Sequence, residues 1–114
     1  MTIKDYAMLA GRTLSDKKAQ DIVIVDIQGK ATFADYFVIC SGGSERQIQS
    51  LADDVEDVFA KNGLLVKSIE GRQGSGWILM DFGDIIVNVF TREMRERYNI
   101  EKVWGDCEFI EVED

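Results

Sequence analysis

Apolar positions along the chain follow a helical spacing in some stretches and form strand-like runs in others. From Ile3 onward, apolar residues recur every three or four positions, which predicts a first helix that Thr2 can cap. Residues 21–27 are apolar and β-branched on both faces, as is typical of a buried strand. Residues 35–40 form a second strand-like run, so we expect the chain to begin with one helix and two strands.

The most regular helical pattern follows these strands. Ser44 and Gln47 have the spacing of a capping box, and Asn62 with Gly63 forms a C-terminal stop signal. Residues 64–70 are then predicted to form a third strand and residues 71–76 a loop. The apolar face of this second helix consists of Ile48, Leu51, Ala52, Val55, Val58 and Phe59.

Residues 77–90 have the pattern of a β-hairpin. Gly83 followed by Asp84 is suited to a two-residue type II′ turn, which would pair Trp77 with Phe90. The period of two along a strand then sorts the side chains onto two faces. One face is wholly apolar and is expected to meet the helices: Ile78, Met80, Phe82, Ile85, Val87 and Val89. The other, which we call the mixed face, holds Trp77, Leu79, Asp81, Ile86, Asn88 and Phe90.

The mixed face combines large apolar side chains with a carboxylate and an amide. A solvated sheet face does not need large aromatic groups, and a core disfavours Asp81 and Asn88 unless they have partners. Aromatic groups with a few polar groups are typical of protein–protein contacts. The alternative is that a terminal helix covers this face and that Asp81 meets a backbone amide or an arginine.

The rest of the chain predicts a short helix from about Thr91, with Met94 and Tyr98, and more weakly Val103 and Trp104, packing back on the sheet. The expected fold class is an α/β two-layer sandwich with a mixed five-stranded sheet, in the order α-β-β-α-β-β-β-α. Residues 1–107 would form a single domain. Residues 108–114 would be an acidic tail that either adds an edge strand or frays.

Composition excludes several kinds of site. The chain has no histidine, which removes imidazole bases, serine–histidine and cysteine–histidine pairs, and histidine metal ligands. Its two cysteines form no C-x-x-C motif, and Cys40 is expected to be a small buried apolar residue. No apolar run approaches the roughly 20 residues that span a bilayer, and the N-terminal stretch lacks a signal-peptide core. We therefore expect a cytoplasmic protein without membrane contact.

The net charge of −8 indicates the class of partner. An acidic protein is repelled by nucleic-acid phosphates and attracted to basic proteins. Arg92, Arg95 and Arg97 alternate with glutamates, which favours a solvated helix with local ion pairs over a nucleic-acid patch.

A nucleotidyltransferase site is the enzymatic alternative. The stretch "SGGSE" at a strand-to-helix junction could hold phosphates, and carboxylates could hold two metal ions. That chemistry needs two carboxylates side by side on one strand. Here Met80 and Phe82 flank Asp81, and Asp84 lies in the turn. We therefore predict no catalytic residues, no metal and no cofactor.

The blocks "DIVIVDIQGKATFADYFVICSGGSERQIQSLAD", "EG", "WILMDFGDIIVNVF" and "RERYNIEKVWGD" resemble the Iojap-like ribosomal silencing factor family over about residues 18–106. The resemblance implies a nucleotidyltransferase-like fold without the activity, usually as a homodimer. It also implies binding to the large ribosomal subunit through ribosomal protein fourteen. Bound there, the protein would block joining of the small subunit and repress translation when nutrients run short. Organellar relatives are linked to late large-subunit assembly, which is the alternative function.

The resemblance and the mixed face together indicate a set of contact residues. Trp77 would anchor the contact with Leu79 beside it, Asp81 and Glu70 would meet arginine or lysine, and Asn88 would donate or accept a hydrogen bond. Tyr98 is a further candidate, and incidental contact with ribosomal RNA is possible. Asn88 stands where the family pattern has histidine, so this position has no group that titrates near neutral pH.

Overall fold

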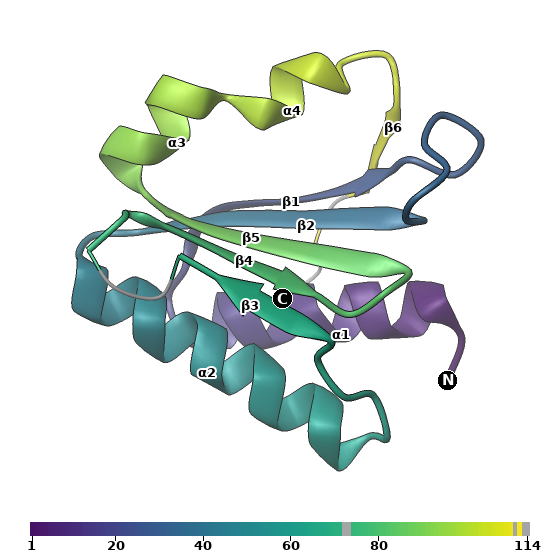
Figure 1. Ribbon diagram of the computed structural model, residues 1–114, viewed down its shortest axis with the longest axis horizontal. Coiled ribbons are helices and arrows are strands. Elements are labelled where there is room, and N and C mark those ends of the chain that lie inside the picture. Colours follow the sequence, from purple (N-terminus) through teal and green to yellow (C-terminus); the bar gives the residue numbers. More distant parts are fainter. Residues whose placement is uncertain (72–73, 111, 113–114) are drawn as a thin grey trace.

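The computed structural model describes residues 1–71, 74–110 and 112 as one sheet with helices on both of its faces (Figure 1). The helices α1 and α2 lie on one face, and α3 and α4 lie on the other. The elements are α1 (Ile3–Asp16), β1 (Gln20–Asp26), β2 (Tyr36–Gly42), α2 (Glu45–Lys61), β3 (Ser68–Glu70), β4 (Trp77–Asp81), β5 (Ile85–Thr91), α3 (Arg92–Tyr98), α4 (Ile100–Val103) and β6 (Glu108–Ile110).

The sheet is mixed and open. Its strand order is β3-β4-β5-β2-β1-β6, with β2 and β5 parallel and every other neighbouring pair antiparallel. All seven residues of β2 are buried, which agrees with its position in the middle of the sheet. The predicted class, a mixed α/β fold, is therefore confirmed.

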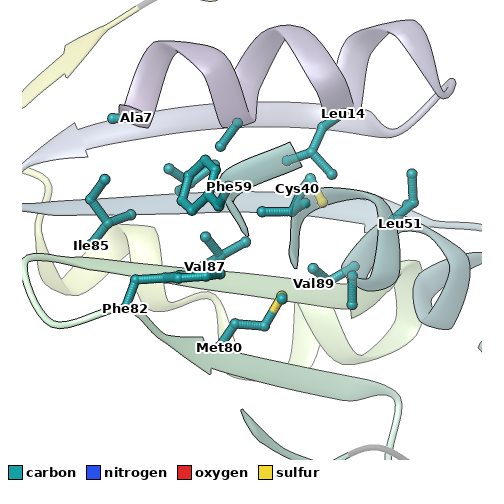
Figure 2. Close-up of a cluster of buried hydrophobic side chains, with 14 of the residues drawn as sticks. Ala7, Leu14, Cys40, Leu51, Phe59, Met80, Phe82, Ile85, Val87 and Val89 are labelled. Carbon is teal, nitrogen blue, oxygen red and sulfur yellow. The ribbon is translucent and has the colours of Figure 1, made fainter. Parts of the chain in front are cut away.

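The main core lies between the sheet and the helices α1 and α2. Figure 2 shows side chains from both helices and from β2, β4 and β5 pointing toward one another. The rings of Phe59 and Phe82 meet edge to face with centroids 4.6 Å apart, and Cys40 is fully buried in the same cluster. The apolar face of the hairpin is buried throughout, as its period of two predicts.

The two long helices begin at the residues that the sequence indicates. Thr2 and Asp5 form a complete capping box at the start of α1. The Ser44 hydroxyl accepts the Gln47 N–H at the start of α2, while the Gln47 side chain accepts the N–H of Gly43 rather than that of Ser44. The side chain of Gln47 thus binds the backbone one residue before the position that a capping box would use.

The hairpin has the predicted register. Trp77 lies opposite Phe90, Leu79 opposite Asn88 and Asp81 opposite Ile86. Gly83 has a φ of +95°, as the first central residue of a type II′ turn requires. The mixed face lies on the side of the sheet where α3 packs, because Trp77 and Phe90 belong to the same apolar cluster as Met94 of α3.

The structure differs from the predicted architecture in two ways. The sheet has six strands rather than five, because residues 108–110 pair with β1 as an edge strand. The sandwich also has a partial third layer, because α3 and α4 pack on the second face of the sheet. Phe37, Ile39 and Phe90 project onto that face and are buried there, so the apolar residues on both faces of these strands account for the extra layer.

Other boundaries also shift. The strand predicted over residues 64–70 is limited to β3, because β4 ends at Asp81 and the turn leaves no partner for residues 64–66. The predicted loop at 71–76 includes residues 72 and 73, which lie outside the described residues. The prediction of a solvated helix is wrong for Arg95, which is 9% exposed. Val103, expected to pack back on the sheet, is 73% exposed.

Candidate functional site

Trp77 is held from three sides on the mixed face. Its ring stacks on Phe90 with centroids 5.0 Å apart, and the tilted ring of Tyr98 lies 5.0 Å away. Its indole Nε1 donates a hydrogen bond of 3.0 Å to Oδ1 of Asn88. The side chain is nevertheless only half-buried. Trp77 is therefore an aromatic group fixed in one orientation with part of its surface accessible, which favours its use as a binding anchor.

The backbone at Gly71 approaches the backbone of Trp77 closely. Gly71 has a φ of +79°, and a Cβ placed on it would lie 2.0 Å from the carbonyl oxygen of Trp77. The hydroxyl of Ser75 accepts the N–H of Trp77 at 3.2 Å. The turn before β4 thus needs glycine at position 71 to let the two backbones approach.

Two hollows adjoin Trp77, and both are lined by Trp77 and Leu79. The first has a volume of about 270 Å³ and includes Glu70, Met94 and Tyr98 in its lining. The second has a volume of about 280 Å³, and its lining also includes Phe33, Phe37, Asn88, Val103 and Trp104. A protein surface that inserted side chains on either side of Trp77 would therefore find apolar walls in both hollows.

The predicted acidic contact residues lie at the edge of this region. Glu70 is exposed at the end of β3, opposite Leu79. Asp81 is half-buried, and its Oδ1 accepts the N–H of Gly83 at 2.8 Å. The alternative expectation that Asp81 would meet a backbone amide is thus confirmed. That hydrogen bond fixes the carboxylate at the start of the turn.

The terminal helices cover only part of the mixed face. Trp104 packs edge to face on Phe37 with ring centroids 5.6 Å apart, and Phe90 and Asn88 are buried. Trp77, Leu79 and Ile86 stay half-buried. One part of the mixed face is therefore covered by the terminal helices, and the other part is accessible for contact. Five of the six predicted contact residues keep exposed surface. Asn88, at 1% exposure, is the sixth.

Asn88 is an unusual residue in this site. Its Nδ2 is the one buried side-chain nitrogen or oxygen without a hydrogen-bond partner in the described part of the chain.

Sequence patterns did not identify Phe33 and Val103 as residues of the site. Both are exposed apolar residues that line the second hollow. Phe33 lies in a loop and Val103 in a four-residue helix, so neither carries a periodic signal.

Three polar groups of the "SGGSE" stretch are engaged within the protein. Ser44 caps α2, Gln47 binds the N–H of Gly43, and Ser41 accepts a hydrogen bond of 3.0 Å from Nη1 of the buried Arg95. Within residues 1–71, 74–110 and 112, no group of three or more acidic or cysteine side chains is placed to hold a metal ion. Nor does any helix in these ranges have the length and apolar character to cross a membrane.

A family model described as "Ribosomal silencing factor during starvation" matches residues 1–114. The chain belongs to this family. A curated ribosomal silencing factor from Bacillus subtilis is 39% identical over 113 residues, covering 99% of this chain and 96% of that protein. A crystal structure of a protein from Chromobacterium violaceum has a TM-score of 0.88 at 31% identity, covering 92% of this chain and 88% of that one. The family resemblance drawn from the sequence blocks is thus confirmed.

The family extends to organelles. The mouse protein named "Mitochondrial assembly of ribosomal large subunit protein 1" is 30% identical over 95 residues, which cover 80% of this chain and 41% of the mouse protein.

Proposed function

We propose that this protein binds the large ribosomal subunit through ribosomal protein fourteen and blocks joining of the small subunit by steric exclusion. Translation would thereby be repressed when nutrients are limiting. Membership of a family named for ribosomal silencing during starvation supports this proposal. The protein would act in the cytoplasm, as a homodimer when free, and without bond-making chemistry.

The observation that carries the proposal is the fixed, half-buried Trp77 between two apolar hollows. Aromatic anchors with accessible apolar neighbours dominate the energy of protein–protein contacts. Glu70 lines the first hollow beside this anchor, Asp81 lies on the same face at the far end of β4, and the chain carries a net charge of −8. Because ribosomal proteins are basic, these charges would raise the association rate and orient the complex.

A subunit-joining experiment tests the proposal. Purified small and large subunits are mixed at a magnesium concentration that favours joining, with and without an excess of the protein, and separated on a sucrose gradient. We expect the protein to migrate with the large subunit and the joined ribosome peak to decrease. An unchanged joined peak, with the protein bound to large subunits, would contradict silencing.

A role in late large-subunit assembly is the second candidate, supported by the name of the mouse relative. An assembly factor would use the same docking face but act on precursors. Depletion of the protein from growing cells separates the two roles. Accumulation of large-subunit precursors during rapid growth would favour assembly, whereas a defect confined to the transition into starvation would favour silencing.

A further inference from the structure

The hydrogen bond between Trp77 and Asn88 has a direction that the ring contacts of Trp77 lack. Phe90 and Tyr98 meet the indole through their rings, each with a centroid distance of 5.0 Å. Such contacts constrain the plane of the indole, but they distinguish little between its two orientations, which are related by a turn of about 180° in χ2. The bond of 3.0 Å from Nε1 to Oδ1 of Asn88 forms in only one of these orientations.

The two edges of the indole differ in chemistry. One edge carries the N–H donor, and the opposite edge carries Cε3 and only C–H groups. Asn88 is 1% exposed, so its hydrogen bond directs the nitrogen edge of Trp77 toward the interior of the protein. The edge that carries Cε3 is then turned away from Asn88. In the reversed orientation, a partner of the half-buried Trp77 would meet a different edge of the ring.

Packing alone does not explain an asparagine at this position. Its Oδ1 accepts the indole N–H, but its Nδ2 has no hydrogen-bond partner in the described part of the chain. A buried donor without a partner lowers stability, and a leucine of similar volume would carry no such donor. The benefit of the amide therefore lies in the acceptor that it offers to Trp77.

We propose that Asn88 is a positioning residue of the docking face, which acts on the partner through Trp77 and does not touch the partner itself. Its Oδ1 determines which edge of the indole is presented to the ribosomal surface. This inference rests on the proposed function, in which Trp77 is the anchor of the contact. Without the acceptor, the N–H would face an apolar side chain, so the indole turns over and brings its donor to water. Binding then weakens in proportion to the fraction of molecules that keep the competent orientation.

NMR of the isotopically labelled full-length protein tests the orientation without any ribosome. The indole signals of Trp77 are assigned by their loss in Trp77→Phe. In the wild type, nuclear Overhauser effects should connect the Hε1 proton of Trp77 with the Hβ protons of Asn88. In Asn88→Leu we expect the Hε3 proton of Trp77 to show the effects to the side chain at position 88 instead. Asn88→His at pH 8 should restore the wild-type pattern, because a neutral imidazole offers an acceptor. The proposal is overturned if Hε1 keeps its contact with position 88 in Asn88→Leu.

Co-sedimentation with purified large ribosomal subunits tests the consequence for docking. Asn88→Leu should weaken binding about five- to tenfold, which corresponds to reversing a preference set by one hydrogen bond. Asn88→His at pH 8 should bind within about twofold of the wild type, because the competent orientation is again the main one. Val55→Ala is the control for lost stability, because Val55 is fully buried in the core on the other face of the sheet, and it should bind as the wild type does.

The outcomes separate this inference from the proposed function. A folded Asn88→Leu protein that binds as tightly as the wild type, while Trp77→Ala does not bind, would overturn the positioning role and leave the docking face intact. Failure of the wild type to bind large subunits would overturn the proposed function together with the docking role of Asn88. The Overhauser pattern would still decide whether Asn88 orients Trp77.

Discussion

Arg95 and Glu101 form a bidentate ion pair that joins α3 to α4. Nε of Arg95 lies 2.8 Å from Oε1 of Glu101, and Nη2 lies 2.5 Å from Oε2. The remaining nitrogen, Nη1, donates to the hydroxyl of Ser41 on β2. One buried guanidinium thus ties the two terminal helices to the centre of the sheet, and it maintains the layer that covers part of the mixed face.

Removing the carboxylate from this ion pair should be costly. Glu101→Ala leaves a guanidinium that is 9% exposed without its counter-charge, and we expect the free energy of unfolding in urea to fall by about 3 kcal/mol. Glu96→Ala, at an exposed position of α3, is the matched control and should change it by less than about 0.5 kcal/mol. Equal losses in the two variants would show that the pair does not hold the helices.

The hydrogen bond between Trp77 and Asn88 predicts a pH effect in Asn88→His. A buried neutral imidazole can accept the indole N–H, whereas a protonated one cannot, so burial and this bond lower the histidine pKa relative to the unfolded chain. Stability gained from the neutral form is present above the unfolded pKa of about 6.5 and is lost as the pH falls, by up to about 1.4 kcal/mol per pH unit. Urea unfolding at pH 7 and pH 5 should show this loss relative to the histidine-free wild type. A pH response equal to that of the wild type would contradict burial of the imidazole.

The close approach at Gly71 predicts a large effect of a single methyl group. In Gly71→Ala the new Cβ would meet the Trp77 carbonyl oxygen at 2.0 Å, so the turn before β4 must move. We expect a loss of about 3 kcal/mol in unfolding free energy. Gly29→Ala shares a positive φ but meets nothing within 4 Å, so it should cost only about 1 kcal/mol. Similar losses would mean that backbone strain, rather than the collision, determines the effect at position 71.

Much of the fold was predictable because local signals agreed with one another. The Gly83–Asp84 turn determined the hairpin register, and the period of two then assigned Ile78 and Met80 to the core correctly. The sixth strand was not determined by the sequence. Residues 108–110 are one charged and two apolar side chains, which suits either a strand or a frayed end, and only the free edge of β1 decides between them.

The candidate site was partly predictable for the same reason. Register alone placed Trp77, Leu79 and Asp81 on one face, but it carried no information on how far the terminal helices extend over that face. That coverage depends on the non-local contact between Arg95 and Ser41, which lie 54 positions apart. Phe33 joins the site through the packing of a loop against Trp104, which has no local sequence signal.

The two cysteines should differ sharply in reactivity. Complete burial raises the pKa of the Cys40 thiol to about 12, so this residue should react with Ellman's reagent only after unfolding. Desolvation and the neighbouring Asp106 carboxylate raise the pKa of Cys107. Its reaction should therefore be slower than that of free cysteine at pH 8 and should accelerate as the pH rises to 9. Rapid labelling of native Cys107→Ser would show that Cys40 is accessible.

The most direct test of the docking face is co-sedimentation of Trp77→Ala with purified large ribosomal subunits. Leu65→Ala, at a 72% exposed position that lines neither hollow, is the control, and circular dichroism verifies that both variants are folded. We predict that Trp77→Ala weakens binding by a factor of about 30 or more, as loss of an aromatic anchor typically does, while Leu65→Ala binds as the wild type does. A folded Trp77→Ala protein that co-sediments as fully as the wild type would contradict the account.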